Sequence, residues 1–156
     1  MTRPAAELTY LAAPYTHNDK AIEAARFAAV TRKAAQWFAA GRLAFSPLTH
    51  SHPIARLLGP AAGDWKTWAA FDTAMVRACP RFAVYRLPGF DTSTGVAAEI
   101  KLAKGLGRTI DYVDPTALAL AALERDAETF RLLDHLQLSA AATRAGYVPD
   151  TIEAGQ

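Results

Sequence analysis

The chain has 156 residues, enough for one domain with a substantial hydrophobic core. Hydrophobic residues make up 51%, charged residues 21%, and the net charge is +2, a normal globular balance that gives no support for nucleic-acid binding. The single cysteine, Cys79, excludes an internal disulfide. No membrane-length apolar run and no apolar signal-peptide core occur, so we expect a cytoplasmic protein with no membrane partner.

Residues 8–13 form an apolar run that predicts the first strand, which Pro14 ends. Asn18 or Asp19 can cap a helix that runs to about residue 40. A helical wheel places Glu23, Arg26 and Lys33 on one side. The other side carries Phe27, Phe38, Ala24, Ala35, Ala28 and Ala39. We expect this second side to pack on a sheet.

Residues 43–47 predict the second strand. Residues 48–63 begin with Thr-His-Ser-His-Pro and end with Gly-Pro-Ala-Ala-Gly, so we expect a long loop with one helical turn near residues 54–58. Asp64 can cap a helix over residues 65–78, which Pro80 ends. Cys79 continues the apolar face of that helix, which favours a buried thiol over a nucleophile.

Residues 81–87 predict the third strand, and a helix follows the Asp-Thr-Ser-Thr-Gly segment at residues 91–95. Residues 109–113 predict a fourth strand. Such strand–helix units in series predict an α/β fold, with a parallel, doubly wound sheet of four to five strands and helices on both faces. We expect an α/β domain over residues 1–114. Residues 115–156 should form a helical extension, packed on the core or at a dimer interface.

Two predicted helices each place one acidic residue within an apolar face. Glu99 falls between Leu102 and Ala103 on one wheel, and Asp72 falls in the middle of the apolar arc on the other. Two purely structural roles are also open to Glu99. In a capping box it would require Val96 as the N-cap, and valine is a poor N-cap. Alternatively, its carboxylate lies at the edge of the apolar arc and reaches water. Asp72 could be satisfied by backbone N–H groups or an arginine. Two such acids together favour a cleft with acid and nucleophile roles.

In open parallel sheets, ligands bind beyond the carboxyl ends of the strands. Polar residues follow the first three predicted strands: Tyr15 and Thr16, then Ser46, His50 and His52, then Asp91, Thr92, Ser93 and Glu99. The helix start near Ser93 and Gly95 offers backbone N–H groups to an anion or a sugar. His50 and His52 lack a clustered third ligand, and no dinucleotide or P-loop motif occurs. We therefore expect neither a metal nor a cofactor.

Four segments resemble the nucleoside 2-deoxyribosyltransferase-like superfamily. They are Tyr-Leu-Ala-Ala-Pro-Tyr-Thr at 10–16, Phe-Ser-Pro-Leu at 45–48, Trp to Asp at 68–72, and Ser-Thr-Gly-Val-Ala-Ala-Glu-Ile at 93–100. Within that superfamily, the sequence is similar to a small bacterial and phage family of undefined function. The resemblance implies a Rossmann-like (flavodoxin-like) fold. It also implies cleavage of the N-glycosidic bond of a (deoxy)nucleoside or nucleoside 5′-monophosphate, as hydrolase or deoxyribosyltransferase.

The resemblance also implies residue roles. Glu99 matches the nucleophile, Asp72 matches the acid near the leaving base or sugar hydroxyls, and Tyr10 or Tyr15 matches the tyrosine that orients the nucleophile. Ser93 matches a hydroxyl that holds a 5′-phosphate in monophosphate-specific relatives. We take Glu99, Asp72 and Tyr10 as the catalytic candidates. The substrate-binding candidates are Tyr15, Ser46, His50, Asp91, Ser93, Thr94 and Gly95.

Oligomers are usual in the superfamily, so the resemblance implies a homodimer or higher homo-oligomer. Trp65, Trp68 and the C-terminal helix are the candidate contacts. A different class of function stays open: a catalytically silent module that binds a nucleotide or a sugar phosphate. A purely structural or interaction protein is favoured only if Glu99 and Asp72 lie far apart.

Overall fold

A computed structural model describes residues 7–59 and 65–144, with residue 65 and residues 138–144 described by their backbone alone. The described chain contains a four-stranded sheet in which every pairing is parallel. Its strands are β1 (Thr9–Ala12), β2 (Ala44–Phe45), β3 (Arg81–Tyr85) and β4 (Ile110–Val113). Their order is β2-β1-β3-β4, so the two central strands are β1 and β3.

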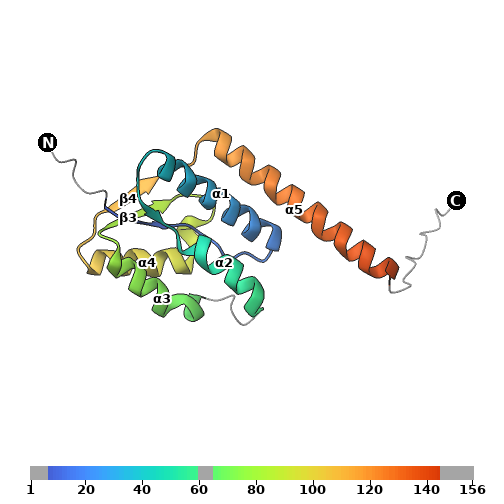
Figure 1. Cartoon of the computed structure of the whole chain (residues 1–156), viewed down its shortest axis with the longest axis horizontal. Coiled ribbons are helices and arrows are strands. Elements are labelled where there is room, and N and C mark those ends of the chain that lie inside the picture. Colours follow the sequence, from blue (N-terminus) through green and yellow to red (C-terminus); the bar gives the residue numbers. More distant parts are fainter. Residues whose placement is uncertain (1–6, 60–64, 145–156) are drawn as a thin grey trace.

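Helices cover both faces of this sheet. They are α1 (Lys20–Ala39), α2 (Pro47–Leu58), α3 (Trp65–Ala78), α4 (Thr94–Gly105) and α5 (Ala117–Arg144), with a short 3₁₀ helix, η2 (Phe90–Thr92), before α4. Figure 1 shows α1 and α5 on one side of the strands and α3 and α4 on the other. The predicted α/β fold with a doubly wound parallel sheet is confirmed, and it is consistent with a Rossmann-like architecture.

Alternation along the central strands builds a core on each face. Leu11 and Tyr85 pack on the side of α1 and α5. Tyr10, Phe82 and Val84 pack on the side of α3 and α4. All five side chains are at most 1% exposed, and burying each large apolar side chain contributes roughly 2 kcal/mol. The central strands are therefore fixed from both sides, and the residues beyond their ends have a rigid base.

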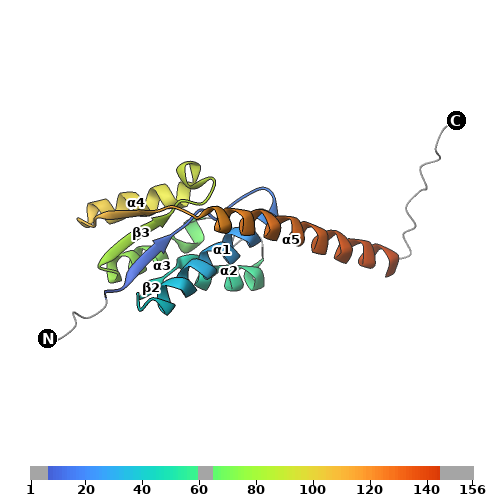
Figure 2. The same cartoon turned by 90° about the horizontal axis from the view of Figure 1, so that it is seen from above.

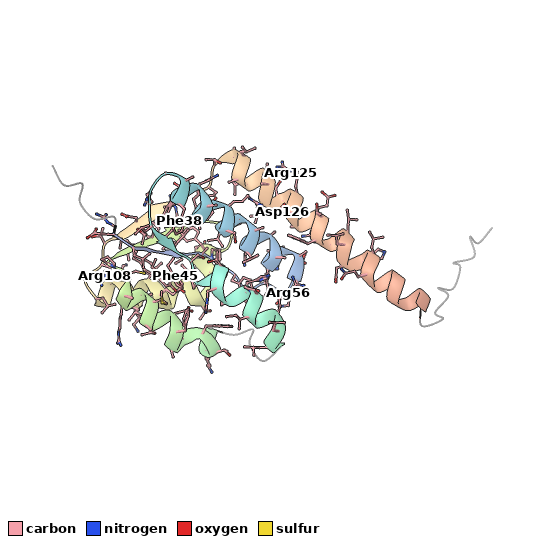
Figure 3. The ribbon with its side chains drawn as sticks, viewed as in Figure 1. Phe38, Phe45, Arg56, Arg108, Arg125 and Asp126 are labelled. Atoms are coloured by element: carbon pink, nitrogen blue, oxygen red, sulfur yellow. The ribbon has the colours of Figure 1, made fainter. Side chains whose placement is uncertain are left out.

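The predicted face of α1 is wrong. Phe38 is 56% exposed near the end of the helix (Figure 3), whereas Glu23 and Arg26 are buried. The residues that α1 buries are Ala21, Glu23, Ala25, Arg26, Ala29, Val30 and Trp37. Alanines occur on every side of this helix, so the predicted buried face was set mainly by the positions of Phe27 and Phe38. The backbone N–H of His17 donates to Glu23 at 3.0 Å, and loop carbonyl oxygens described below accept hydrogen bonds from Arg26, so both charged residues can face inward.

The predicted loop is wrong for residues 48–53, because the helix α2 begins at Pro47 and includes the helical turn expected near residues 54–58, and residues 60–63 lie outside the described residues. Pro47 occupies the first turn, where its missing N–H is tolerated, and Pro53 lies inside the helix. The sequence reading treated the two prolines and the turn residues as loop signals. The expected cap at Asp64 lies outside the described residues.

The helix α5 packs against α1 and then extends past the rest of the molecule (Figures 1 and 2). Leu123 and Ala127 are buried in the core on that side. Two ion pairs also join the helices, Arg32 to Asp126 and Arg131 to Asp19, each 2.7 Å between nitrogen and oxygen. None of the described helices has the length and apolar character needed to cross a membrane.

Candidate active site

A cavity of about 520 Å³ opens beyond the carboxyl ends of β1 and β3. It lies where the chain leaves β1 for α1 on one face and leaves β3 for α4 on the other, the usual ligand position in such sheets. Its described lining is Ala13, Tyr15, Thr16, Pro47, Leu48, Ser51, Ala55, Lys66, Trp68, Asp72, Thr92, Ser93, Thr94, Gly95, Val96 and Glu99.

Glu99 lies in the wall of this cavity and is 7% exposed. It shares the buried face of α4 with Val96 and Ala103, as the wheel predicted. Tyr10 lies behind it, fully buried and stacked on Phe82 with 5.3 Å between ring centroids. The Tyr10 hydroxyl donates a hydrogen bond of 2.7 Å to Oε1 of Glu99. Tyr10 therefore fixes the carboxyl group without lining the cavity itself.

Asp72 reaches the same cavity from α3 and is 6% exposed. Its Oδ1 is buried and has no hydrogen-bond partner within the described part of the chain. Most buried carboxyl oxygens find a donor, so an unpaired one at a cavity wall is typical of a functional group. The structure thus brings together the two acids that the sequence placed in apolar helix faces. The alternative of a purely structural protein was favoured only if the two acids lay far apart, and both line one cavity.

Burial raises the pKa of both carboxyl groups. The pKa of Asp72 rises to about 6, because burial removes water from its charged form. The pKa of Glu99 rises to about 8, mainly through burial and further through the charge of Asp72, while the Tyr10 hydrogen bond lowers it. Between these values the two groups together carry one proton. Such a pair holds one acid and one base near neutral pH.

The N-terminus of α4 forms another part of the wall. Ser93 is the N-cap, and its side chain accepts a long hydrogen bond of 3.4 Å from the Val96 N–H. Thr94 and Gly95 follow in the first turn, where backbone N–H groups have no carbonyl partner within the helix. All three residues line the cavity, as expected. The helix N-terminus favours a negatively charged or strongly polar ligand group here.

Tyr15 lines the cavity and contacts His52 from α2. The Tyr15 hydroxyl and Nδ1 of His52 are 2.6 Å apart, and the His52 ring stacks on Phe27 at 4.1 Å. Burial lowers the pKa of His52 and raises that of Tyr15 to about 12, so both rings are neutral at pH 7. According to its tautomer, the neutral histidine accepts a hydrogen bond from the Tyr15 hydroxyl or donates one to it, and in both cases the Tyr15 oxygen keeps a lone pair for a donor group of a ligand.

Sequence reasoning missed the contribution of α2 to the cavity. Leu48, Ser51 and Ala55 line it from successive turns of that helix, and Pro47 lines it at the helix start. The spacing of three and four residues marks one helix face, but it had no meaning while the segment was read as a loop. Lys66 and Trp68, at the start of α3, complete the wall. Trp68 was expected at a subunit contact, whereas the Trp65 side chain lies outside the described residues.

Three predicted binding residues do not reach the cavity. Ser46 is 1% exposed and precedes α2, with its Oγ turned into the protein. His50 stacks on Phe71 with 4.6 Å between centroids, because it lies on a different face of α2 from Leu48 and Ser51. Asp91 is exposed on η2, where the next residue, Thr92, faces the cavity instead. Within the described chain, no three His, Cys, Asp or Glu residues cluster as metal ligands.

Arg26 joins the two loops that flank the cavity. Its guanidinium donates to the carbonyl oxygens of Tyr15 at 3.1 Å and Thr16 at 2.9 Å, and to that of Pro88 at 2.9 Å. Gly89 adopts φ +90°, and a Cβ there would lie 2.5 Å from Nη2 of Arg26. Only glycine therefore allows this close approach. These three hydrogen bonds explain why α1 can bury the charged side chain of Arg26.

We expect Arg26→Met to lower the free energy of unfolding by roughly 3 kcal/mol, because three hydrogen bonds from a charged donor are lost. Urea unfolding followed by circular dichroism measures this change. Arg42→Met is the matched control, since Arg42 is exposed and stacks on Trp37 without reaching either loop. An equal loss in both variants would show that Arg26 has no special role in holding the loops.

Comparison with known proteins adds one finding. The family described as Domain of unknown function (DUF1937) matches residues 7–113, about two thirds of the chain. The chain belongs to this family. The DUF1937 match spans the whole sheet and both carboxyl groups and ends before α5 begins. No curated protein matches the chain significantly. The site of this DUF1937 domain must therefore be interpreted from its own geometry.

Proposed function

We propose that this protein cleaves the N-glycosidic bond of a (deoxy)nucleoside or a nucleoside 5′-monophosphate. The observation that carries the proposal is that two buried acids, Glu99 and Asp72, line one cavity, and that Tyr10 donates a hydrogen bond to Glu99 from behind the wall. Glycosidic cleavage passes through an oxocarbenium-like transition state and needs one charged and one protonated carboxyl group. The pair carries one proton near neutral pH, mostly on Glu99 in the empty cavity, so the proposed reaction uses the form in which that proton has moved to Asp72.

In the proposed reaction, the Glu99 carboxylate attacks the anomeric carbon of the sugar and forms a glycosyl ester. The bond between that carbon and the base nitrogen breaks, and its electron pair leaves with the base. Asp72 gives its proton to the departing base. Water or a second base then attacks the anomeric carbon and gives its proton to the Asp72 carboxylate, and Glu99 leaves as a carboxylate. Water makes the protein a hydrolase, and a second base makes it a deoxyribosyltransferase.

The cavity walls suit a nucleoside. Leu48, Trp68 and Val96 supply apolar surface for a flat base. Tyr15 and Ser51 offer hydroxyl groups to the sugar or the base. A 5′-phosphate could bind the backbone N–H groups of Thr94 and Gly95 at the start of α4. These features support the substrate class, while the identity of the base stays open.

The test is an assay of the purified protein with deoxynucleosides, ribonucleosides and their 5′-monophosphates, in which chromatography detects free base. We expect base release from at least one of them, and a new nucleoside when a second base is added if the protein is a transferase. A slow 2-fluoro substrate should leave a sugar-sized adduct on the Glu99 peptide, as mass spectrometry would show. Binding without base release would favour the silent nucleotide-binding module instead.

A further inference from the structure

The helix α5 carries a second apolar face that nothing in the described structure covers. Leu118, Leu132, Leu133 and Leu136 are 75%, 59%, 49% and 62% exposed. At 100° per residue, eight positions lie within about 60° of Leu118 on the helix wheel. We call them the outer stripe: Leu118, Ala121, Ala122, Arg125, Thr129, Leu132, Leu133 and Leu136.

The four leucines of the outer stripe face away from the rest of the protein, and Ala121 and Ala122 are half-buried between them and the core. Leu123, Ala127 and Phe130 lie on the opposite side of the wheel and pack on the core beside α1. Asp126 also lies on the side that faces α1 (Figure 3), where it pairs with Arg32. A helix with apolar residues on two opposite faces requires a covering on both. Four exposed leucines along about 27 Å of helix are too many for a solvated face.

The outer stripe is complementary to itself in one arrangement. Consider a two-fold axis that runs between the two helices, perpendicular to both, at the height of residue 127. It would place Leu118 against the partner's Leu136. It would place Ala121 beside the partner's Leu132, and Ala122 beside the partner's Leu133. Leu132 and Leu133 on one helix then each meet an alanine on the other, and Leu118 meets Leu136. Such pairing of large and small side chains fills the space between isologous helices.

Charge supports the same arrangement. Arg125 is the one cation within the outer stripe, and this axis brings it beside the partner's Glu128. A polar pair beside an apolar seam favours one register over others. The helix α5 also lies beyond residues 7–113, which match the family. The outer stripe therefore lies outside the residues that match the family.

We propose that the outer stripe of α5 binds a second copy of this chain, with the two α5 helices antiparallel about an axis near residue 127. The two α/β domains then lie on opposite sides of the helix pair, with both cavities open. The seam is at the small end of specific interfaces, so dimerisation should depend on protein concentration in the micromolar range.

Sedimentation velocity of the full chain over a range of concentrations tests the proposal. We expect a dimer for the wild type, and at least ~100-fold weaker dimerisation for Leu132→Lys/Leu136→Lys, because two charges would enter the seam. Leu57→Lys/Leu58→Lys is the matched control, since both leucines are exposed on α2 and outside the stripe. A wild type that stays monomeric, or equal weakening in both variants, would overturn the proposal.

Disulfide trapping tests whether the two α5 helices are antiparallel or parallel, and it changes only the residues that are replaced by cysteine. Leu118→Cys/Leu136→Cys should cross-link two chains under mild oxidation, because the antiparallel arrangement brings these positions together. Leu136→Cys alone should not, because the two copies of that position would lie about 27 Å apart. Cross-linking by Leu136→Cys alone indicates parallel helices, and the absence of a cross-link in the double variant indicates another interface. Either result contradicts the proposal. The native Cys79 is buried and does not interfere.

Discussion

Replacing Glu99 with glutamine is expected to abolish base release while making the folded protein more stable. The nucleophile is lost, so kcat/KM should fall at least ~1000-fold. Burial raises the folded pKa of Glu99 from 4.5 to about 8. A raised carboxyl pKa means that stability is fully present below about pH 4.5 and is lost as pH rises towards 8. Glutamine stays neutral and can still accept the Tyr10 hydrogen bond, so it avoids this loss.

The stability gain of Glu99→Gln should therefore grow with pH. We expect little difference from the wild type near pH 4.5, and a difference on the order of 3 to 5 kcal/mol near pH 8.5. Urea unfolding at several pH values measures it. Glu124→Gln, which changes an exposed glutamate on α5, should stay within about 0.5 kcal/mol of the wild type throughout. A pH-independent gain would mean that Glu99 is not buried in its neutral form.

The pH profile of base release is expected to be bell-shaped, with kcat/KM highest near pH 7. Activity needs one proton on the Glu99–Asp72 pair, which exists between the pKa values of about 6 and about 8. Below this window both groups are protonated and no nucleophile remains. Above it both are charged and no acid remains. These limits belong to the pair, so the profile holds whichever group carries the proton in the empty cavity.

Asp72→Asn separates the two roles. Without the acid, kcat/KM should fall by about 10²- to 10⁴-fold with ordinary bases, and less with an electron-poor base that leaves without a proton. The alkaline limb should disappear, and the acidic limb should move from about pH 6 to higher pH, because it then reports Glu99 alone, whose pKa stays raised mainly by burial. Asp111→Asn, an exposed change on β4, should leave the profile unchanged. Retention of the alkaline limb in Asp72→Asn would assign the acid role to another group.

Periodicity in the sequence predicted the fold and the two central acids. The runs around β1 and β3 are apolar because both faces are covered, and such strands are recognisable without further context. Glu99 and Asp72 stood out because each breaks an otherwise apolar helix face, and both are buried in the structure. The sequence of a single helix was sufficient for this prediction, because the apolar face and the acid that interrupts it belong to the same helix.

The remaining features depend on contacts that are distant in the sequence. Arg26 faces inward only because the carbonyl oxygens of Tyr15, Thr16 and Pro88 are there to accept its hydrogen bonds. The helix α2 forms despite Pro53, and its face decides that Ser51 lines the cavity and His50 does not. No wheel drawn on a single segment contains that information, because tertiary packing overrides local preference.

The crevice beyond β1 and β3 exists because the backbone turns to opposite faces of the sheet after these two strands. It is thus a product of connectivity, and the hydrogen bonds of Arg26 hold the two loops that flank it. Exposed lining residues such as Lys66 or Thr92 can be exchanged without disturbing the buried strands. Selection can therefore retune which small molecule enters while the scaffold and its two acids stay in place, so relatives with this architecture are free to diverge in ligand preference.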